Sequence, residues 1–236
     1  MFKNLIYLLI LITVSISCTK TKYSEKTTDA SLLEPKDEIV YLKGTDQKFT
    51  GIAIKKYKNG KLQFKRQYKD GIQDGISTTW YDTGIKYLEG KVVDGKKEGK
   101  WVSWHRDGVK ILENNFKNGL KHGEQISYYT LDTFLKFKGK PKNYSTKKPQ
   151  VNTISYFKNG KEEGVSKSWY SNGKIHTEIN YKDGKREGKT IFWFMNGKKR
   201  YLSYFKDGKL HGKSTEFSED GKVLFEGNYR NGVKLK

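Results

Sequence analysis

Asn-Gly and Asp-Gly pairs recur along this chain, and apart from two longer gaps the intervals between the glycines of successive pairs alternate between 11 and 13 residues. These dipeptides tolerate positive φ at both central positions of a type I′ turn, so each pair predicts a hairpin reversal. A full period of 24 residues, as from Gly71 to Gly95, therefore contains two strands and two turns. The turn glycines are Gly60, Gly71, Gly95, Gly108, Gly119, Gly160, Gly173, Gly184, Gly197, Gly208, Gly221 and Gly232.

Each unit repeats two further features. A second glycine stands four residues after the turn glycine, which predicts a wide turn or a bulge where the next strand starts. A large aromatic residue stands nine residues after the turn glycine, once in each of six units. The second glycines are Gly75, Gly99, Gly123, Gly164, Gly188 and Gly212. The aromatic residues, called the tryptophan row below, are Trp80, Trp104, Tyr128, Trp169, Trp193 and Phe217.

The complete motif is an aromatic residue, any residue, Asn or Asp, and Gly, followed by a second glycine, an aromatic pair and a second turn. It is present as Tyr181 to Gly184, Gly188, Trp193-Phe194 and Asn196-Gly197. Over residues 49–236 the chain resembles the MORN-type repeat family, in the variant set of bacterial proteins labelled antitoxin-like. The resemblance implies an elongated antiparallel meander, and the biochemical activities of the family are diverse. The pattern is interrupted at Thr83, Val92 and Asp132.

The fold class expected is all-β, an elongated single-layer antiparallel β-meander of 24-residue hairpin repeats. Seven periods of two strands give a sheet roughly 65 to 70 Å long, at about 4.8 Å per strand. Alternation along the strands places Val102, Trp104, Ile191 and Trp193 on one face. It places hydroxyl residues on the other. We therefore expect one aromatic face, joined by Phe64 and Tyr68 of the returning strand, and one face whose hydroxyl residues include Ser77, Thr79, Ser103, Ser127, Ser166 and Ser168.

Between Gly119 and Gly160 the interval is 41 residues, which is 17 more than one period. The surplus lies in residues 133–155, which contain two prolines, Pro141 and Pro149, and six lysines between residues 136 and 148. This composition does not suit a central strand. An exposed basic inserted loop is expected, either a tolerated extension of a hairpin or a dedicated binding loop.

The N-terminus predicts export. Lys3 precedes an apolar run from Leu5 to Ile16, which is too short to span a bilayer and suits a signal-peptide core. The following Ser15-Ile16-Ser17-Cys18 resembles a bacterial lipobox, and Cys18 is the only cysteine of the chain. We expect residues 1–17 to be a lipoprotein signal peptide, Cys18 to carry the lipid, residues 18–38 to be a flexible tether, and residues 39–236 to be the repeat array. An ordinary signal peptide is the alternative.

The chain is strongly basic, with 47 Lys and Arg against 26 Asp and Glu, a formal net charge of +21. Much of the excess lies beside turn glycines, so the repeats line it up along the rims of the sheet. We expect such rims to attract an anionic partner, or to serve only as solvated turns. Basic residues between aromatics also fit single-stranded nucleic acid, but export makes that partner unexpected. The candidate basic row, two residues before the turn glycine, is Lys58, Lys69, Lys117, Lys158, Lys182, Lys206 and Arg230.

No catalytic pattern is present in the sequence. The histidines have no metal-ligand spacing, and His122 and His211 occupy a turn slot that holds Asp or Glu in other units. The glycines follow the hairpin period and form no phosphate loop. We therefore expect no enzyme activity, no cofactor, no metal and no small-molecule substrate.

Three functions of different classes are compatible with these observations, and the third, an envelope enzyme that acts on a glycan, is motivated only by the aromatic row. The first is a membrane-anchored lipoprotein of the bacterial cell envelope, a non-catalytic binding or scaffolding surface for a protein or an anionic envelope polymer. The second, taken from the family label, is an antitoxin or immunity-like protein that neutralises a cognate toxin. The tryptophan row is a candidate stacking surface for a glycan or a peptide, or simply the core of each repeat.

Overall fold

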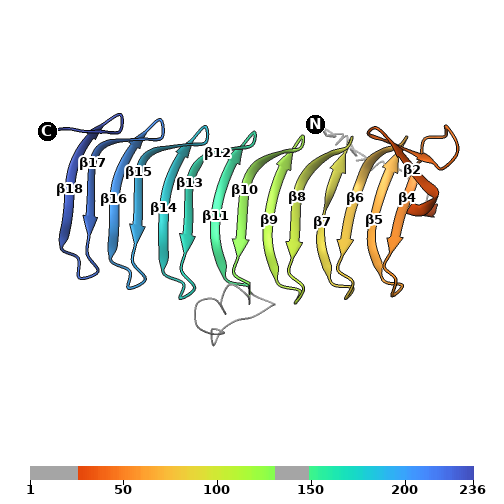
Figure 1. Ribbon diagram of the computed structural model, residues 1–236, viewed down its shortest axis with the longest axis horizontal. Helices are drawn as coiled ribbons and strands as arrows, with labels where there is room; N and C mark the ends of the chain where they lie inside the picture. The colour runs from red at the N-terminus through yellow and green to blue at the C-terminus, as the bar shows by residue number, and fades with distance from the viewer. Residues whose placement is uncertain (1–25, 131–148) are drawn as a thin grey trace, which may run out of the picture.

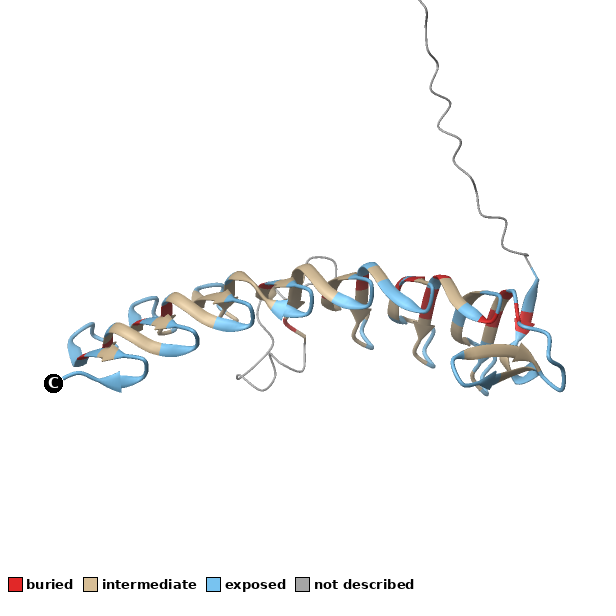
Figure 2. Cartoon of the chain, turned by 90° about the horizontal axis from the view of Figure 1, so that it is seen from above, coloured by how far each residue is buried: buried red, intermediate tan, exposed pale blue. Residues whose placement is uncertain are grey.

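The computed structural model describes residues 26–130 and 149–236. The predicted signal peptide, Cys18 and most of the predicted inserted loop lie outside these residues. Within them the chain forms one long sheet of 17 strands and a separate two-stranded sheet, with one 3-10 helix. Figure 1 shows the strands of the long sheet side by side in chain order, and Figure 2 shows that no second layer covers it along its length. The expected single-layer meander is confirmed.

Almost all neighbouring strands in the long sheet are consecutive in the chain and antiparallel. Strands β12 and β13 are two parts of one position, since both pair with β11. The strands of the N-terminal half are β4 (Gly51–Lys56), β5 (Leu62–Lys69), β6 (Ile72–Trp80), β7 (Lys86–Val93), β8 (Lys96–Trp104), β9 (Lys110–Lys117) and β10 (Leu120–Tyr128). Those of the C-terminal half are β11 (Val151–Lys158), β12 (Lys161–Glu162), β13 (Gly164–Trp169), β14 (Ile175–Lys182), β15 (Lys185–Trp193), β16 (Lys199–Lys206), β17 (Lys209–Phe217), β18 (Val223–Arg230) and β19 (Val233–Lys234).

The turns at the two ends of the strands are of different kinds, which corrects the expectation of type I′ geometry throughout. At one rim both central residues have positive φ, as in Asp183 (51°) and Gly184 (80°). We call this the I′ rim. At the other, only the glycine has positive φ, and the Asn or Asp side chain accepts a hydrogen bond from the N–H two residues on. We call this the Asx rim. Thr83 lies at the Asx rim, where the residue before the turn glycine does not need a positive φ, so a β-branched residue is tolerated.

The second glycines mark bulges, as the sequence predicts. In β6, Ser77 pairs with Arg66 and Gln73 pairs with Tyr68, so three residues of β6 stand opposite one residue of β5. Gly75 lies in this bulge with a φ of 115°. Equivalent shifts recur in later units, so the bulge is a regular part of the repeat.

The two faces of the sheet are less distinct than expected. Residues directly opposite each other on paired strands point to the same face, and Phe64 pairs with Thr79. Phe64 and Tyr68 therefore share the face of the Ser and Thr residues, called the hydroxyl face below. The tryptophan row lies on the other, the tryptophan face. The error arises because bulges between strands break a period-2 pattern carried from one strand to the next.

The N-terminal end of the sheet is covered. Strand β1 (Thr27–Asp29) pairs in parallel with β4, and the helix η1 (Ala30–Leu32) follows it. The hairpin of β2 (Leu33–Lys36) and β3 (Ile39–Leu42) then packs on the first I′ turn, where Val40 N–H donates to the Gly71 carbonyl at 2.9 Å. The expected tether, residues 18–38, is thus corrected from residue 27 onward, because these residues gain backbone partners at the open sheet edge.

The expected loop of residues 133–155 is also corrected at its end. Val151 to Ser155 belong to β11 and pair with β10, with Val151 opposite Tyr128. Residues 133–148 of the expected loop lie outside the described residues.

The buried core is thin and uneven. Trp101 is 4 % exposed, and its indole lies directly over Gly90, where a Cβ would collide with the ring. Its Nε1 donates to the Lys91 carbonyl at 3.0 Å. Six of the seven buried hydrophobic residues precede residue 130, so most of the packing lies in the N-terminal half. They are Phe49, Ala53, Val92, Trp101, Val109, Tyr129 and Ile191.

Candidate binding surfaces

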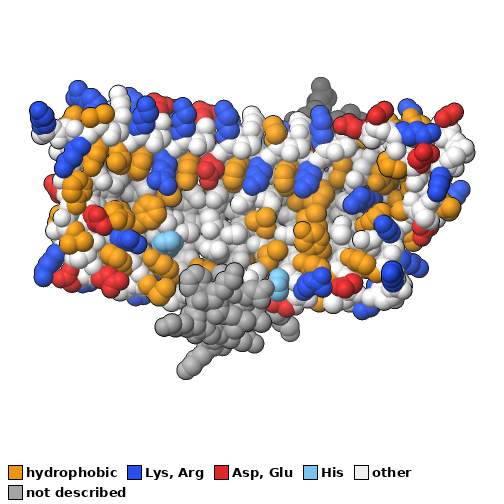
Figure 3. All heavy atoms as spheres, viewed as in Figure 1, with side chains coloured by type: hydrophobic (Ala, Val, Ile, Leu, Met, Phe, Trp, Pro, Cys, Tyr) orange, Lys and Arg blue, Asp and Glu red, His pale blue; other side chains and the backbone are white. Residues whose placement is uncertain are grey.

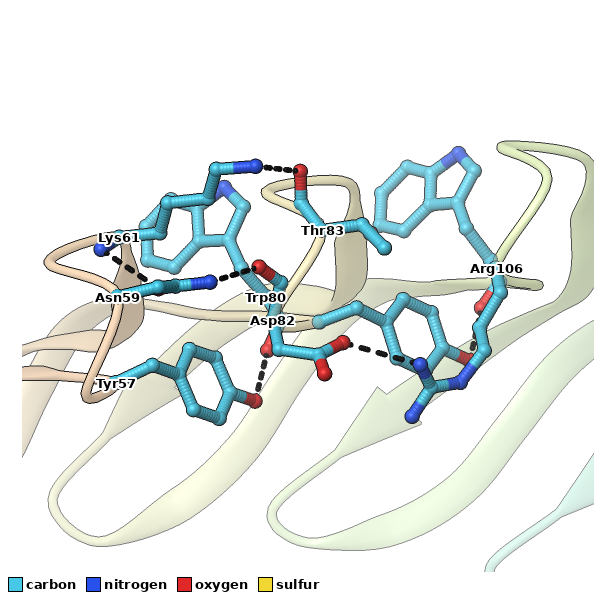
Figure 4. A network of polar contacts seen from close by, with 9 residues as sticks. Tyr57, Asn59, Lys61, Trp80, Asp82, Thr83 and Arg106 are labelled. Atoms are coloured by element: carbon cyan, nitrogen blue, oxygen red, sulfur yellow. Dashed lines mark hydrogen bonds and ion pairs between the residues drawn. The ribbon is translucent and has the colours of Figure 1, made fainter.

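Side chains tie the turns of the Asx rim to one another. Each of three side chains in one turn donates to a backbone carbonyl of the next repeat, at 2.7 to 2.8 Å (Figure 4). The lysine one residue after the turn glycine is one of them, so it is held against its neighbour. The donors of the first turn are Tyr57, Asn59 and Lys61, and the acceptors are the carbonyls of Trp80, Asp82 and Thr83.

The tryptophan row forms the end of this rim. Each of its six members is the last residue of its strand and is half-buried. The carbonyls of four accept a hydrogen bond from a tyrosine hydroxyl of the preceding repeat, at 2.6 to 3.0 Å. The donors are Tyr57, Tyr81, Tyr129 and Tyr170, and the acceptors are Trp80, Trp104, Trp169 and Trp193.

The row is brought together as one residue per repeat, but its rings do not stack on one another. Among the described residues, the ring contacts join other aromatics, such as Trp101 with Phe116 and Phe192 with Tyr201. The rings of the row therefore form no cross-strand ladder among the described residues. Its role as a binding surface stays a prediction.

Beside the row, on the tryptophan face, lies a buried carboxylate. Glu113 is 5 % exposed and receives hydrogen bonds from Lys100 and Lys110. Burial opposes its ionisation, but the two ammonium groups outweigh burial and lower the pKa of Glu113. Burial and the Glu113 carboxylate together raise the pKa of Tyr128 to about 12. This cluster is a structural ion network.

The predicted basic row divides between the two rims. Lys58 lies at the Asx rim, between β4 and β5, so its inclusion in one row is wrong. The error arises because Asn59-Gly60 and Asp70-Gly71 look alike in sequence but close opposite ends of β5. The other six residues lie exposed at the I′ rim: Lys69, Lys117, Lys158, Lys182, Lys206 and Arg230.

In the C-terminal half the I′ rim carries lysines in pairs. Three successive turns place one lysine directly opposite another across the hairpin. Like charges in this position destabilise a hairpin by up to about 1 kcal/mol. Among the described residues none of these six lysines forms an ion pair. The pairs are Lys158 with Lys161, Lys182 with Lys185, and Lys206 with Lys209.

With Arg230, seven cations lie along this part of the rim, which we call the C-terminal basic rim. The same turns also contain Arg186 and five carboxylates, Glu162, Glu163, Asp183, Glu187 and Asp207, so eight cations less five anions leave an excess of three positive charges. Two of the five are already hydrogen-bonded, since Glu163 accepts from the Asp183 N–H and Glu187 from the Asp207 N–H. In the N-terminal half, Ile72, Val93 and Leu120 stand in the place of a lysine.

A second row of cations lies on the hydroxyl face, just inside the I′ rim, and was missed by sequence reasoning. Figure 3 shows basic side chains alternating there with hydrophobic ones. Lys97 lies 4.6 Å from the Trp101 ring, and Lys121 lies 4.7 Å from the Phe157 ring. Such cations are attracted to the ring face, and their stems cover aromatic surface. Their spacing of 24 residues was present in the sequence, but which ring each one covers depends on the register.

Comparison with known families agrees with this geometry. The family model described as "MORN repeat variant" matches residues 49–70, 162–183 and 210–231. Three segments of this chain are similar to MORN repeats. The second and third matches run from just after one I′ turn, through an Asx turn, to the next I′ turn, so they coincide with the structural repeat. The first match starts just before β4 and also ends at an I′ turn. MORN repeats commonly bind membranes or proteins and are typically non-catalytic. No curated protein matches the chain.

Other kinds of site are not found within residues 26–130 and 149–236. No group of three or more His, Cys, Asp or Glu side chains in these ranges could hold a metal ion. No helix there is long and apolar enough to cross a membrane. Cys18, the predicted site of lipid attachment, lies outside them.

Proposed function

We propose that this chain is a non-catalytic repeat protein whose C-terminal basic rim binds an acidic polymer of the cell envelope, and that a lipid on Cys18 anchors it there. The observation that carries the proposal is that three successive I′ turns each place two lysines opposite each other, without ion-pair partners. These pairs destabilise the free protein, and an acidic ligand removes their repulsion.

The geometry of the rim also suits a polymer. Successive I′ turns are separated by two strands, about 9.6 Å. An extended polyanion that follows the rim therefore meets a cation pair at regular intervals, and its binding energy grows with the number of turns covered. A small anion would meet only one pair.

The binding test uses fluorescent polyglucuronate and the chain from residue 26 to 236, at low and at physiological salt. Reversal of Lys158, Lys182 and Lys206 to Glu should weaken binding about tenfold or more, since each rim charge contributes up to about 1 kcal/mol. Higher salt should weaken binding of the wild type and have less effect on the variant.

The matched control reverses Lys69, Lys96 and Lys117, three cations of the N-terminal I′ rim. It changes the net charge by the same amount and should weaken binding much less. Equal losses in the two triple variants would mean that net charge alone attracts the polymer, and the proposal would be wrong. Unchanged binding in both would contradict it as well.

Anchoring has its own test. Metabolic labelling of the full chain with a palmitate analogue should mark the wild type and leave Cys18→Ala unmarked. Equal labelling of the two would remove the lipid from the proposal without affecting the rim.

A further inference from the structure

The hydroxyl face is hollowed over strands β14 to β17. The hollow is a groove of about 460 Å³, within the range of ligand pockets in proteins. Hydroxyl residues form its floor, aromatic rings form its walls, and Arg200 lies at its edge. The residues used below are Thr190, Ser203, Ser214, Phe192, Tyr201, Phe205, His176 and Arg200.

The floor contains a hydroxyl without a partner. Thr190 is 2 % exposed, and its Oγ1 is buried without a hydrogen bond in the described part of the chain. A buried hydroxyl in this state is unfavourable, so a ligand hydroxyl that reaches it gains a hydrogen bond at little desolvation cost. Beside it, the hydroxyls of Ser203 and Ser214 lie 2.7 Å apart, and each keeps unused acceptor capacity.

The walls are rings that stand at steep angles to one another. Phe192 meets Tyr201 at 88° with centroids 6.2 Å apart, and meets His176 at 78° and 6.4 Å. Burial and the nearby Arg200 lower the pKa of His176, since both disfavour its charged form. The walls are therefore mainly aromatic, while the floor carries hydroxyl groups.

Arg200 supplies the charge. Its guanidinium lies 5.6 Å from the Phe194 ring and 5.2 Å from the Tyr201 ring. It forms no ion pair among the described residues, and the Glu216 carboxylate accepts the Tyr201 hydroxyl at 2.6 Å. A planar guanidinium on an aromatic surface is well placed to hold a carboxylate by two hydrogen bonds.

We propose that this groove is a binding subsite for a hexuronic acid unit of an acidic glycan. A pyranose ring presents a C–H face to the aromatic walls and hydroxyls to Thr190, and its carboxylate reaches Arg200. This inference rests on the proposed function and names the class of polymer.

The repeat itself shows what the groove requires. At the position of Thr190, the unit of β8 carries Trp101, whose indole fills the hydroxyl face above Gly90. The other units carry Ser77, Gln125, Ser166 and Ser214 at this position, so Trp101 closes the face in its own unit. The groove lies over β14 to β17, in the same half as the C-terminal basic rim. The rim distance of about 9.6 Å per repeat is close to the length of a disaccharide in a β-1,4-linked chain.

The test measures calorimetric binding of two matched tetrasaccharides to the chain from residue 26 to 236. One is β-1,4-linked glucuronic acid, and the other is cellotetraose, which differs only in carrying alcohols in place of the carboxylates. The wild type should prefer the acidic tetramer about tenfold or more. Arg200→Met should remove that preference, and Thr190→Val should weaken both ligands about fivefold.

Two control variants remove the same groups elsewhere. Arg66→Met removes a guanidinium that lies 4.4 Å from the Phe64 ring, and Thr215→Val alters a buried threonine that does not line the groove. Both should bind like the wild type. A preference that survives Arg200→Met, or a folded wild type that binds neither tetramer, overturns the subsite.

The binding experiments on the rim variant distinguish failure of the groove proposal from failure of the rim proposal. The triple Lys→Glu rim variant should lose polyglucuronate binding and keep most of its preference between the tetramers. Rim-dependent polymer binding without tetramer binding would leave the proposed function standing and remove the groove.

Discussion

The N-terminal and C-terminal halves of the array share one backbone fold and differ in the side chains at equivalent positions. In the N-terminal half, Trp101 lies over Gly90 and closes the hydroxyl face at β7 and β8, and Ile72 and Leu120 each stand opposite a single lysine at the I′ rim. In the C-terminal half, Thr190 leaves that face open. Lysine pairs occupy the rim there. The repeat thus fixes positions through turns and bulges, and single rows of side chains decide whether a unit contributes packing or a binding surface.

The largest expected effect is loss of the N-terminal packing. Trp101→Ala removes a nearly buried indole and the hydrogen bond of its Nε1, so we expect a loss of about 3 to 5 kcal/mol in the free energy of unfolding. Thr190→Ala, at the same position of the repeat, should cost less than about 1 kcal/mol. Urea unfolding followed by circular dichroism measures both. Similar losses in the two variants would remove the contrast between the halves.

A methyl group added at Gly90 tests the contact between Gly90 and the Trp101 indole from the glycine side. Gly90→Ala should cost about 1 to 3 kcal/mol, because the new Cβ collides with the Trp101 indole. The matched variant is Gly227→Ala, at the equivalent position of the last repeat. Its Cβ meets the flexible Lys234 side chain and the Phe225 ring at 3.1 Å, and it should cost less. A larger loss for Gly227→Ala in thermal unfolding would contradict this ranking.

The Glu113 cluster makes the N-terminal half sensitive to acid. The folded pKa of Glu113 lies below its ordinary value, so its contribution is complete above the pKa of the unfolded chain and is lost as pH falls through the folded pKa. Glu113→Gln should cost about 1 to 2 kcal/mol at pH 7. The variant should also lose less stability than the wild type between about pH 5 and pH 3. Parallel acid profiles for the two proteins would exclude this cluster as a cause.

The smallest effect has the opposite sign. Thr190→Val removes a hydroxyl that has no partner, so the free energy of unfolding should stay unchanged or rise by up to about 1 kcal/mol. Thr78→Val is the control, since the Thr78 hydroxyl donates to Glu89 at 3.1 Å, and it should destabilise. If Thr190→Val destabilises as much as Thr78→Val, the Thr190 hydroxyl has a partner in solution.

The sequence predicted the features that depend on local chemistry. Asp183-Gly184 forms its turn because those two residues adopt positive φ, and Gly188 forms its bulge for the same reason. Contacts between repeats were harder to predict from the sequence. The hydrogen bond from Tyr57 to the Trp80 carbonyl joins residues 23 apart and depends on the stagger of neighbouring turns, which no local pattern reveals.

Two errors have the same physical origin. Phe64 was expected on the face of Trp80, but the bulge between strands changes the alternation. Thr27 was expected in a tether, but it pairs in parallel with β4, and a parallel pairing needs no tight turn that a sequence could display. The groove was missed for a related reason, since an unpartnered Thr190 hydroxyl is a property of its surroundings and not of its sequence.

Amide hydrogen exchange with and without polyglucuronate tests most directly whether binding is confined to one half. Protection should increase at the I′ turns of residues 157–162, 181–186 and 205–210, and stay unchanged at residues 68–73 and 92–97. Equal protection of the two sets of turns, or protection confined to the N-terminal set, would contradict a binding surface built by the C-terminal basic rim.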